Sequence, residues 1–338
     1  MARPRVLYTD PPWLVEGGRC DPARATVEAR ALGDVELVFG PYAGGRYALD
    51  DPELLVRAKD ADVVVVYRCP VTAELLDAAG PALRAVVRQG VGIDNLNAAL
   101  LAERGLPGYH LPDYCVDEVS THTTALALAL ERALVPQHAT LVGGTFDIYA
   151  GGVPRRTGRR TLGIVGFGRI GRAVARKLGP HYGATLVHDP YLGRDLAEGY
   201  GARATDTLAD LLGAADLVTL HCPLTGETDR LIDRAALRAM RPDAFLVNAA
   251  RGRLVDPLAL HEALAGGWIA GAGLDVFSPE NPHDDPAWQA VLRHPGVVVT
   301  SHRAFLSADA EASSRRRVAE LVRDLLAGST RLPGQVTP

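Results

Sequence analysis

Residues 162–171 read Leu-Gly-Ile-Val-Gly-Phe-Gly-Arg-Ile-Gly. This stretch opens with a short apolar run typical of a buried strand, and residues 172–178 after it have the composition of a helix. In this setting a first glycine makes the turn, a second lets the backbone approach a pyrophosphate, and a third lets helix and strand pack closely. We therefore predict a dinucleotide-binding turn made of Gly166, Phe167, Gly168, Arg169, Ile170 and Gly171.

A carboxylate follows where such a turn needs one. Asp189 follows shortly after the next apolar run, 184–187. There it would accept hydrogen bonds from the adenosine ribose hydroxyls and would repel a 2′-phosphate. Glycine patterns also occur in ordinary turns, but the strand, the helix and the acid together favour a nucleotide. We predict NAD rather than NADP as the cofactor.

Short apolar runs alternate with helix-like segments along the whole chain, as in a parallel sheet covered by helices. We therefore predict an α/β fold. One series of strands is expected at 5–9, 35–39, 63–67, 83–88 and 108–110, and a second at 162–165, 184–187, 217–220, 244–248, 269–276 and 296–300. A long helix is predicted over 117–134, an irregular connection over 143–160, and a final helix capped by Ser307.

Composition limits the classes of protein and partner. The 338 residues exceed the usual size of one hydrophobic core, so two domains are expected. A net charge of −4 gives no bulk attraction to nucleic acid or to anionic lipid, and we predict neither as a partner. The four cysteines lack zinc-site spacing and are too few for a disulfide scaffold, so we expect reduced thiols and no metal site.

The longest apolar run, 123–130, is too short for a bilayer, which needs about 20 residues. No apolar stretch of signal-peptide type follows the N-terminus. We expect a cytoplasmic protein that does not enter a membrane, and no regulatory module after residue 338.

Three polar side chains stand where predicted strands end, on the rim where open α/β sheets build their sites. They are Arg251, Glu280 and His302. Hydride transfer to a keto acid needs a cation that holds the carboxylate and polarises the carbonyl, and an acid that protonates the new alkoxide. Glu280 would hold the tautomer of His302 and stabilise the imidazolium. Singly, each residue has an ordinary explanation, such as a surface histidine or an ion pair, and only the joint pattern indicates catalysis.

At these positions the sequence resembles the D-isomer specific 2-hydroxyacid dehydrogenases, which include D-3-phosphoglycerate dehydrogenase, and within them a C-terminal-binding-protein-like branch. The resemblance covers nearly the whole chain and is highly specific, because its motifs follow in order. These are residues 87–95, 112–119, 161–171, 188–191, 221–225 with Thr228, 248–256, 273–277 and 300–305.

The resemblance implies two Rossmann-like domains with the active site in the cleft between them. It implies a flavodoxin-like substrate domain at 1–110 plus 308–338 and an NAD-binding domain at 111–307. By position, His302 becomes the acid/base, Glu280 its partner and Arg251 the anchor of the substrate carbonyl and carboxylate. The backbone at Val91 and Gly92 would bind that carboxylate; Cys222, Pro223 and Thr228 would line the adenosine, and Ala249, Ala250 and Asp275 would face the nicotinamide. The helix after Glu118 resembles a dimerisation arm, so a homodimer is expected.

This chain departs from the family pattern at a few positions. Ser301 replaces the usual Pro, and Ala304 with Phe305 replaces smaller residues after the histidine. Arg68 and Arg88 stand in loops that the resemblance places near the substrate. They raise the hypothesis of a second anionic group on the substrate, such as a carboxylate, phosphate or phosphonate, against the alternative of structural ion pairs.

Other functions remain open at the level of sequence. One is an NADH-sensing protein that binds partners, as corepressors of the same branch do. Another is formate or phosphite oxidation; formate dehydrogenases typically have Gln in place of Glu280, whereas phosphite oxidation stays possible. An NADP-dependent reductase is disfavoured by Asp189.

Overall fold

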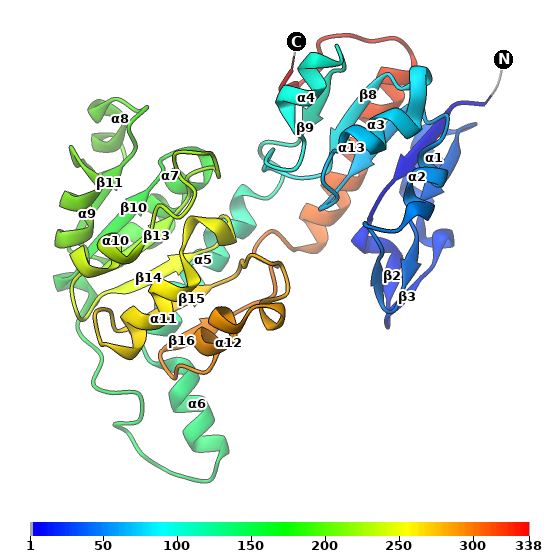
Figure 1. The fold of residues 1–338 in the computed structure, drawn as a ribbon. Coiled ribbons are helices and arrows are strands. Elements are labelled where there is room, and N and C mark those ends of the chain that lie inside the picture. Colours follow the sequence, from blue (N-terminus) through cyan, green and yellow to red (C-terminus); the bar gives the residue numbers. More distant parts are fainter. Residues whose placement is uncertain (1–2, 338) are drawn as a thin grey trace. The chain divides into compact units, whose positions relative to one another are not determined.

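The computed structural model describes residues 3–337. Contacts between α-carbons divide the chain into two compact units (Figure 1). Unit 1 comprises residues 1–114 and 307–338, and unit 2 comprises residues 115–306. The predicted α/β class is confirmed, because each unit contains a parallel sheet covered by helices.

Unit 1 is built on a five-stranded parallel sheet of order β4-β1-β7-β8-β9, the order of flavodoxin-like folds. Val6 and Tyr8 face one side of it and pack with α1 and α13, whereas Leu7 faces the other side with α2, α3 and α4. The strands are β1 Arg5–Tyr8, β4 Glu36–Phe39, β7 Val63–Val66, β8 Ala85–Arg88 and β9 Gly108–His110. The helices are α1 Thr26–Leu32, α2 Pro52–Ala58, α3 Ala73–Ala79, α4 Ala98–Glu103 and α13 Ala308–Leu326.

Unit 2 is built on a seven-stranded parallel sheet of order β12-β11-β10-β13-β14-β15-β16. Helices α5, α7 and α8 cover one face, and α9 to α12 cover the other. The strands are β10 Thr161–Val165, β11 Ala184–His188, β12 Arg203–Ala204, β13 Leu217–Leu220, β14 Phe245–Asn248, β15 Gly271–Leu274 and β16 Val297–Val299. The helices are α5 Val116–Glu131, α6 Leu134–Val142, α7 Arg169–Leu178, α8 Arg194–Glu198, α9 Leu208–Ala214, α10 Arg234–Ala239, α11 Pro257–Ala265 and α12 Pro286–Leu292.

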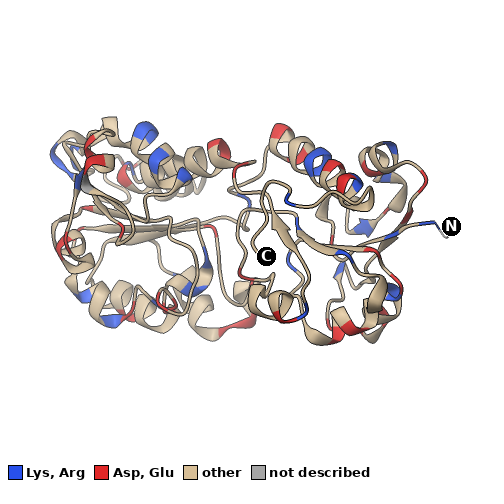
Figure 2. Cartoon of the chain, turned by 90° about the horizontal axis from the view of Figure 1, so that it is seen from above, with Lys and Arg blue, Asp and Glu red and all other residues tan. Residues whose placement is uncertain are grey.

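The inner strands of both sheets are apolar and buried on two faces, and in each unit most of the charged residues lie on the covering helices and on loops (Figure 2). This arrangement explains why the strands read as continuous apolar runs rather than as alternating patterns. No helix in the described part of the chain combines the length and the hydrophobicity that crossing a bilayer requires.

The long helix predicted over 117–134 is wrong at its end. Helix α5 stops at Glu131, Ala133 has the left-handed backbone angle φ of +51°, and α6 begins at Leu134. A left-handed residue breaks the helical hydrogen-bond ladder, and alanine gives no sign of that in a sequence. Helices α2 and α8 to α12, strand β12 and two hairpins were also not predicted individually. The hairpins are β2 Val15–Glu16 with β3 Arg19–Cys20 and β5 Tyr42–Ala43 with β6 Arg46–Tyr47.

The final helix is confirmed. The Ser307 hydroxyl accepts a hydrogen bond from the Ala310 amide (2.9 Å) at the start of α13. Val318 and Val322 of α13 are fully buried against the sheet of unit 1. The fold alone does not test the roles predicted for the two domains. Substrate binding by residues 1–110 with 308–338 and NAD binding by residues 111–307 stay predictions here.

Candidate active site

The glycine turn lies between β10 and α7 and has the geometry that the sequence predicts. Gly166 has φ of +88°, and a Cβ on it would lie 2.5 Å from the backbone nitrogen of Cys222. A Cβ on Gly171 would lie 2.2 Å from the carbonyl oxygen of Gly166. A Cβ on Gly168 would meet no atom within 4 Å, so the backbone there is open to a ligand. The turn therefore fits a pyrophosphate at the start of α7, where backbone amides and the helix dipole favour an anion.

The turn also occupies the position where such sheets bind nucleotides. Strand β10 has β11 on one side and β13 on the other, so the chain reverses its direction of winding at β10. In open α/β sheets, ligands bind outside the carboxyl ends of the strands at this switch point.

Asp189 follows β11 and is bonded to the glycine turn itself. Its Oδ2 accepts the Phe167 amide (2.8 Å), and its Oδ1 accepts the Tyr191 amide (3.0 Å). Each carboxylate oxygen has two lone pairs, so capacity remains for ribose hydroxyls. The side chain thus fixes the turn and lies at the end of the strand next to it.

The segment after β13 closes the other side of the switch point. Burial raises the pKa of the Cys222 thiol to about 11, which favours the neutral thiol over the thiolate. The Thr228 hydroxyl donates to the Pro223 carbonyl (2.6 Å) and accepts the Thr225 amide (2.8 Å). The predicted adenosine-side residues Cys222, Pro223 and Thr228 therefore belong to one internally bonded loop.

Arg251 lies in a loop that follows β14. The Asn248 side chain donates to the Arg251 carbonyl (2.8 Å) and accepts the Ala250 amide (3.0 Å), which fixes the backbone on both sides of Ala249. The Arg251 guanidinium donates to the Ala250 carbonyl (2.7 Å). Gly252 is required next, because a Cβ there would lie 2.1 Å from the backbone of Phe277.

His302 and Glu280 are brought together. The distance from His302 Nδ1 to Glu280 Oε1 is 2.7 Å. Their side chains are 26% and 44% exposed, so both can meet a ligand from solvent. The pair fixes the imidazole through Nδ1 and leaves Nε2 for proton transfer.

Asp275 holds the segment that carries His302. It is fully buried, and it accepts the Arg303 amide and the Ala304 amide (both 2.9 Å) and the Thr300 hydroxyl (2.5 Å). Its own carbonyl accepts the His302 amide (2.7 Å). Both carboxylate oxygens of Asp275 therefore accept hydrogen bonds from the protein. Asp275 was predicted to face the nicotinamide, and the contacts that the structure shows for its side chain support the loop of residues 300–304.

The predicted substrate residues Arg68, Arg88, Val91 and Gly92 belong to unit 1, whereas Arg251, Glu280 and His302 belong to unit 2. The guanidinium carbons of Arg68 and Arg88 lie 5.6 and 5.5 Å from the centroid of the Tyr67 ring. Arg88 also donates to Asn95 (3.3 Å) and to the Gln89 carbonyl (2.9 Å). The two arginines therefore share one aromatic ring beside the loop that contains Val91 and Gly92.

Two residues that hold loops of the candidate site were not predicted from the sequence. The buried Asp10 carboxylate accepts the amides of Tyr67 (3.0 Å), Arg68 (2.6 Å) and Cys69 (3.2 Å). Burial raises the pKa of Asp10 above its usual value. The other support is His122 of α5, whose Nε2 lies 2.9 Å from Thr300 Oγ1. The position of Asp10 directly after the predicted strand 5–9 could have indicated its role. No feature of the sequence around His122 indicates a contact with Thr300.

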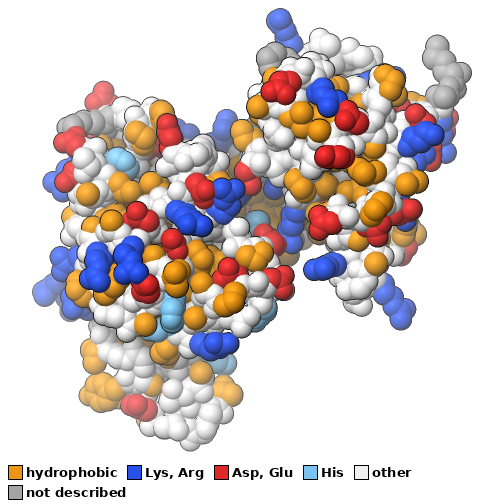
Figure 3. Space-filling view, viewed as in Figure 1, with side chains coloured by type: hydrophobic (Ala, Val, Ile, Leu, Met, Phe, Trp, Pro, Cys, Tyr) orange, Lys and Arg blue, Asp and Glu red, His pale blue; other side chains and the backbone are white. Residues whose placement is uncertain are grey.

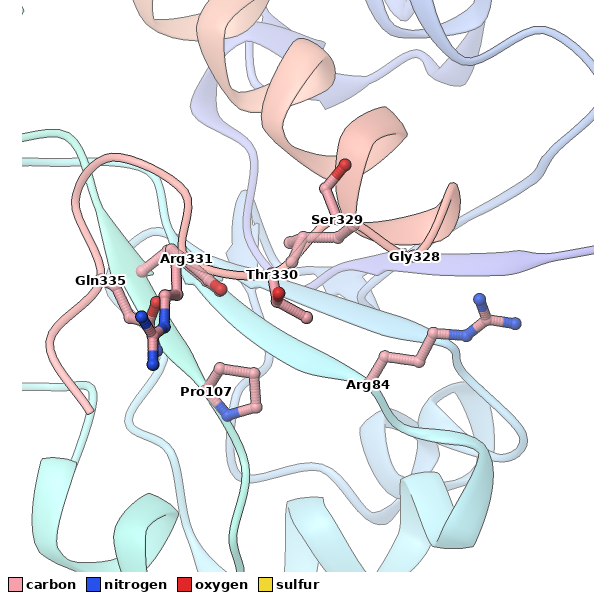
Figure 4. A pocket seen from close by; sticks show the side chains of 9 residues that line it. Arg84, Pro107, Gly328, Ser329, Thr330, Arg331 and Gln335 are labelled. Atoms are coloured by element: carbon pink, nitrogen blue, oxygen red, sulfur yellow. The ribbon is translucent and has the colours of Figure 1, made fainter. Parts of the chain in front are cut away.

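Two hollows of the surface lie away from the predicted catalytic residues. One, of about 410 Å³, is in unit 1, where the C-terminal tail lines it together with Arg84 and Pro107 (Figure 4). The other, of about 520 Å³, is in unit 2 at the start of β10 and is lined by Arg155, Arg156, Arg159, Arg160, Thr161, Ala214, Asp216 and Arg241. Within residues 3–337, no group of three or more His, Cys, Asp and Glu side chains is placed to hold a metal ion.

Curated relatives can be aligned with this chain over most of its length. It is 35% identical over 299 residues to a D-3-phosphoglycerate dehydrogenase of Methanocaldococcus jannaschii, covering 88% of this chain and 54% of the relative. It is 36% identical over 300 residues to a glyoxylate reductase of Korarchaeum cryptofilum, covering 84% of each. The chain spans about half the length of the D-3-phosphoglycerate dehydrogenases it matches.

Solved structures of dehydrogenases have the same fold over nearly the whole chain. An NAD-dependent formate dehydrogenase from Staphylococcus aureus, in complex with NAD, aligns with a TM-score of 0.86 at 25% identity over 99% of both chains. A D-lactate dehydrogenase from Aquifex aeolicus, complexed with NAD and lactic acid, aligns with a TM-score of 0.83 at 26% identity over 96% of both chains. Residues 124–304, which contain the glycine turn, match the family model described as "D-isomer specific 2-hydroxyacid dehydrogenase, NAD binding domain". The chain therefore belongs to the D-isomer specific 2-hydroxyacid dehydrogenase family.

Proposed function

We propose that this protein is an NAD-dependent dehydrogenase that interconverts a 2-keto acid and the corresponding D-2-hydroxy acid. The observation that carries the proposal is the 2.7 Å pair of His302 and Glu280 in the same unit as the NAD-binding domain. The family and its relatives support the reaction class, and the candidate residues Arg251, Glu280 and His302 follow strands β14, β15 and β16 in turn.

The cofactor would be held by the glycine turn, with its pyrophosphate at Gly168 and its adenosine ribose at Asp189. NAD supplies or accepts the hydride when it is bound. Everything else in the reaction falls to side chains and backbone of this chain. The neighbouring loop of Ala249 and Ala250 is held by the Asn248 side chain and would shape the nicotinamide side of the site.

Arg251 would bind the substrate carboxylate and polarise the carbonyl through its forked donors. As the carbonyl carbon is reduced, negative charge develops on its oxygen, and an imidazolium at His302 would donate the Nε2 proton to it. In the oxidative direction the same nitrogen would accept the hydroxyl proton. Glu280, bonded at Nδ1, would keep the ring oriented and offset its positive charge.

The family resemblance assigns further substrate contacts to Arg68, Arg88, Val91 and Gly92. The amides of Val91 and Gly92 are assigned to the carboxylate. The pairing of Arg68 and Arg88 on Tyr67 favours a substrate that has a second anionic group.

A change at Asp189 tests the cofactor assignment. The wild-type protein is expected to favour NADH over NADPH by about tenfold or more in kcat/KM, since about 1.4 kcal/mol of repulsion between the carboxylate and the 2′-phosphate suffices. Asp189→Asn removes the charge but keeps an acceptor for the Phe167 amide. The ratio should therefore fall towards one while the turn stays intact. A wild-type preference for NADPH, measured with both cofactors at several concentrations, would overturn the assignment.

We also propose a homodimer formed through α6 and the loop after it. Helix α6 has no buried residue within the described chain, and it leads into exposed apolar side chains (Figure 3). The exposed large apolar residues of this arm are Leu134 (55%), Val135 (44%), Leu141 (60%), Val142 (73%), Phe146 (85%), Ile148 (68%), Tyr149 (66%) and Val153 (75%). An exposed apolar patch of this kind marks an interface, and the family resemblance makes a second copy its occupant.

Sedimentation mass tests the dimer. The wild-type protein should have the mass of two chains, and the double variant Phe146→Asp, Ile148→Asp should have the mass of one, because two charges would be buried without partners. Val56→Asp in unit 1 is the control, since Val56 is 65% exposed and lies outside the arm. A wild-type protein with the mass of one chain at micromolar concentration contradicts this assembly.

A further inference from the structure

One partly buried polar contact of unit 2 has no part in the reaction proposed above. His122 lies in the middle of α5, and its side chain is 22% exposed. Its Nε2 lies 2.9 Å from Thr300 Oγ1 and 3.6 Å from Asp275 Oδ1. The contact joins a helix on the face of the sheet to the strand end that carries the predicted acid/base.

The proton positions in this contact follow from the groups themselves. An ionised carboxylate only accepts hydrogen bonds, so the single proton of the Thr300 hydroxyl goes to Asp275 at 2.5 Å. Thr300 Oγ1 must then accept from His122, whose proton sits on Nε2. The direction runs from His122 through Thr300 to Asp275, and each donor has one acceptor.

Asp275 forms hydrogen bonds with residues on both sides of His302, namely Thr300, Arg303 and Ala304. Its carboxylate accepts the amides of Arg303 and Ala304, and its carbonyl accepts the amide of His302. His302 itself has φ of +52°, a conformation that non-glycine residues adopt only where their surroundings impose it. The imidazole can face Glu280 only while this short segment keeps its shape.

We propose that His122 is a positioning residue that holds His302 in its reactive orientation by bonding Thr300 and, through it, Asp275. The inference rests on the proposed function for its effect on rate, but the restraint on residues 300–304 stands on the contacts alone. The competing explanation is that His122 only fills space between α5 and the sheet. The two explanations differ in what a substitute side chain must supply, which is either an N–H donor at the position of Nε2 or merely volume.

Three substitutions separate these explanations. His122→Met fills a similar volume without a donor, His122→Gln places an amide N–H near the position of Nε2, and Thr300→Val removes the hydroxyl from the middle of the chain of bonds. For His122→Met we expect kcat to fall about tenfold, because small displacements of a reacting group have effects of this size or larger. The dissociation constant for NADH should change by less than about twofold, since no nucleotide contact is lost. His122→Gln should recover most of the rate.

Amide hydrogen exchange supplies a readout that needs no substrate. In His122→Met and in Thr300→Val, the amides of Arg303 and Ala304 should exchange about tenfold faster or more, while amides of β10 and β13 keep their wild-type protection. The double variant should be no worse than the more damaging single variant, because both remove the same restraint.

The outcomes decide the matter in either direction. Recovery in His122→Gln with local loss of protection in His122→Met supports the positioning role. Equal loss in His122→Gln and His122→Met, or exchange that rises over the whole unit, shows a packing role and overturns the proposal. If the wild-type protein reduces no 2-keto acid, the proposed function fails while the exchange measurement still decides the restraint.

Discussion

His302→Ala is expected to lower kcat for 2-keto acid reduction by roughly 100-fold or more, the usual effect of a positioned acid/base. The His302 imidazole is hydrogen-bonded to Glu280 at 2.7 Å. Alanine has no imidazole that Glu280 could orient and no group that could transfer the proton. The dissociation constant for NADH should change little, because the glycine turn and Asp189 lie after other strands. Steady-state kinetics together with fluorescence titration of NADH measure the two effects separately.

A matched control is available in the same unit. His181 is exposed and lies at the opposite end of α7 from the glycine turn, so His181→Ala should keep the wild-type rate. Loss of NADH binding in His302→Ala would show that this side chain is structural, and the assignment of acid/base would then be wrong. An unchanged kcat would contradict it equally, and would favour a protein that senses NADH without catalysis.

Arg251→Met is expected to lower kcat/KM by about 1000-fold, the upper range for removing one donor that stabilises developing negative charge. Here the same side chain also binds the substrate carboxylate, so both KM and kcat should suffer. Arg251→Lys should recover only part of the loss, because a lysine is a point charge without the forked geometry. Initial rates over a range of substrate concentrations give the two parameters.

The control for this change is Arg293→Met. Arg293 is exposed near the end of α12 and bonds Gln289 at 3.3 Å, so its replacement should leave kcat/KM unchanged. A fall of less than tenfold in Arg251→Met would show that another cation binds the carboxylate, and the arginines of unit 1 would be the next candidates.

Much of the fold was predictable because its signals are local. The apolar runs of both sheets came from burial on two faces, and the strand Leu217–Leu220 was predicted with its observed bounds. The glycine turn carried its own explanation, since its first and third glycines are forced by contacts and its second lies open. Local chemistry of this kind is written in consecutive residues.

What escaped prediction depends on residues far apart in the chain. Thr300 is bonded to His122 and Asp275, and no spacing in the sequence indicates that α5 reaches the end of β16. The break between α5 and α6 depends on a left-handed alanine, which has no local signature. The family resemblance placed Glu280 and His302 together, and the structure added how the surrounding loop is held.

NADH oxidation by the purified protein with 2-keto acids, measured in parallel with His302→Ala, tests the proposed reaction itself. The set should contain glyoxylate, pyruvate, hydroxypyruvate and phenylpyruvate, together with oxaloacetate and phosphonopyruvate, which have a second anionic group. We expect oxidation of NADH with at least one of them, formation of the D-hydroxy acid, and loss of the rate in the variant. Intact NADH binding without reduction of any of these acids, or an equal rate in wild type and variant, would contradict the proposed reaction.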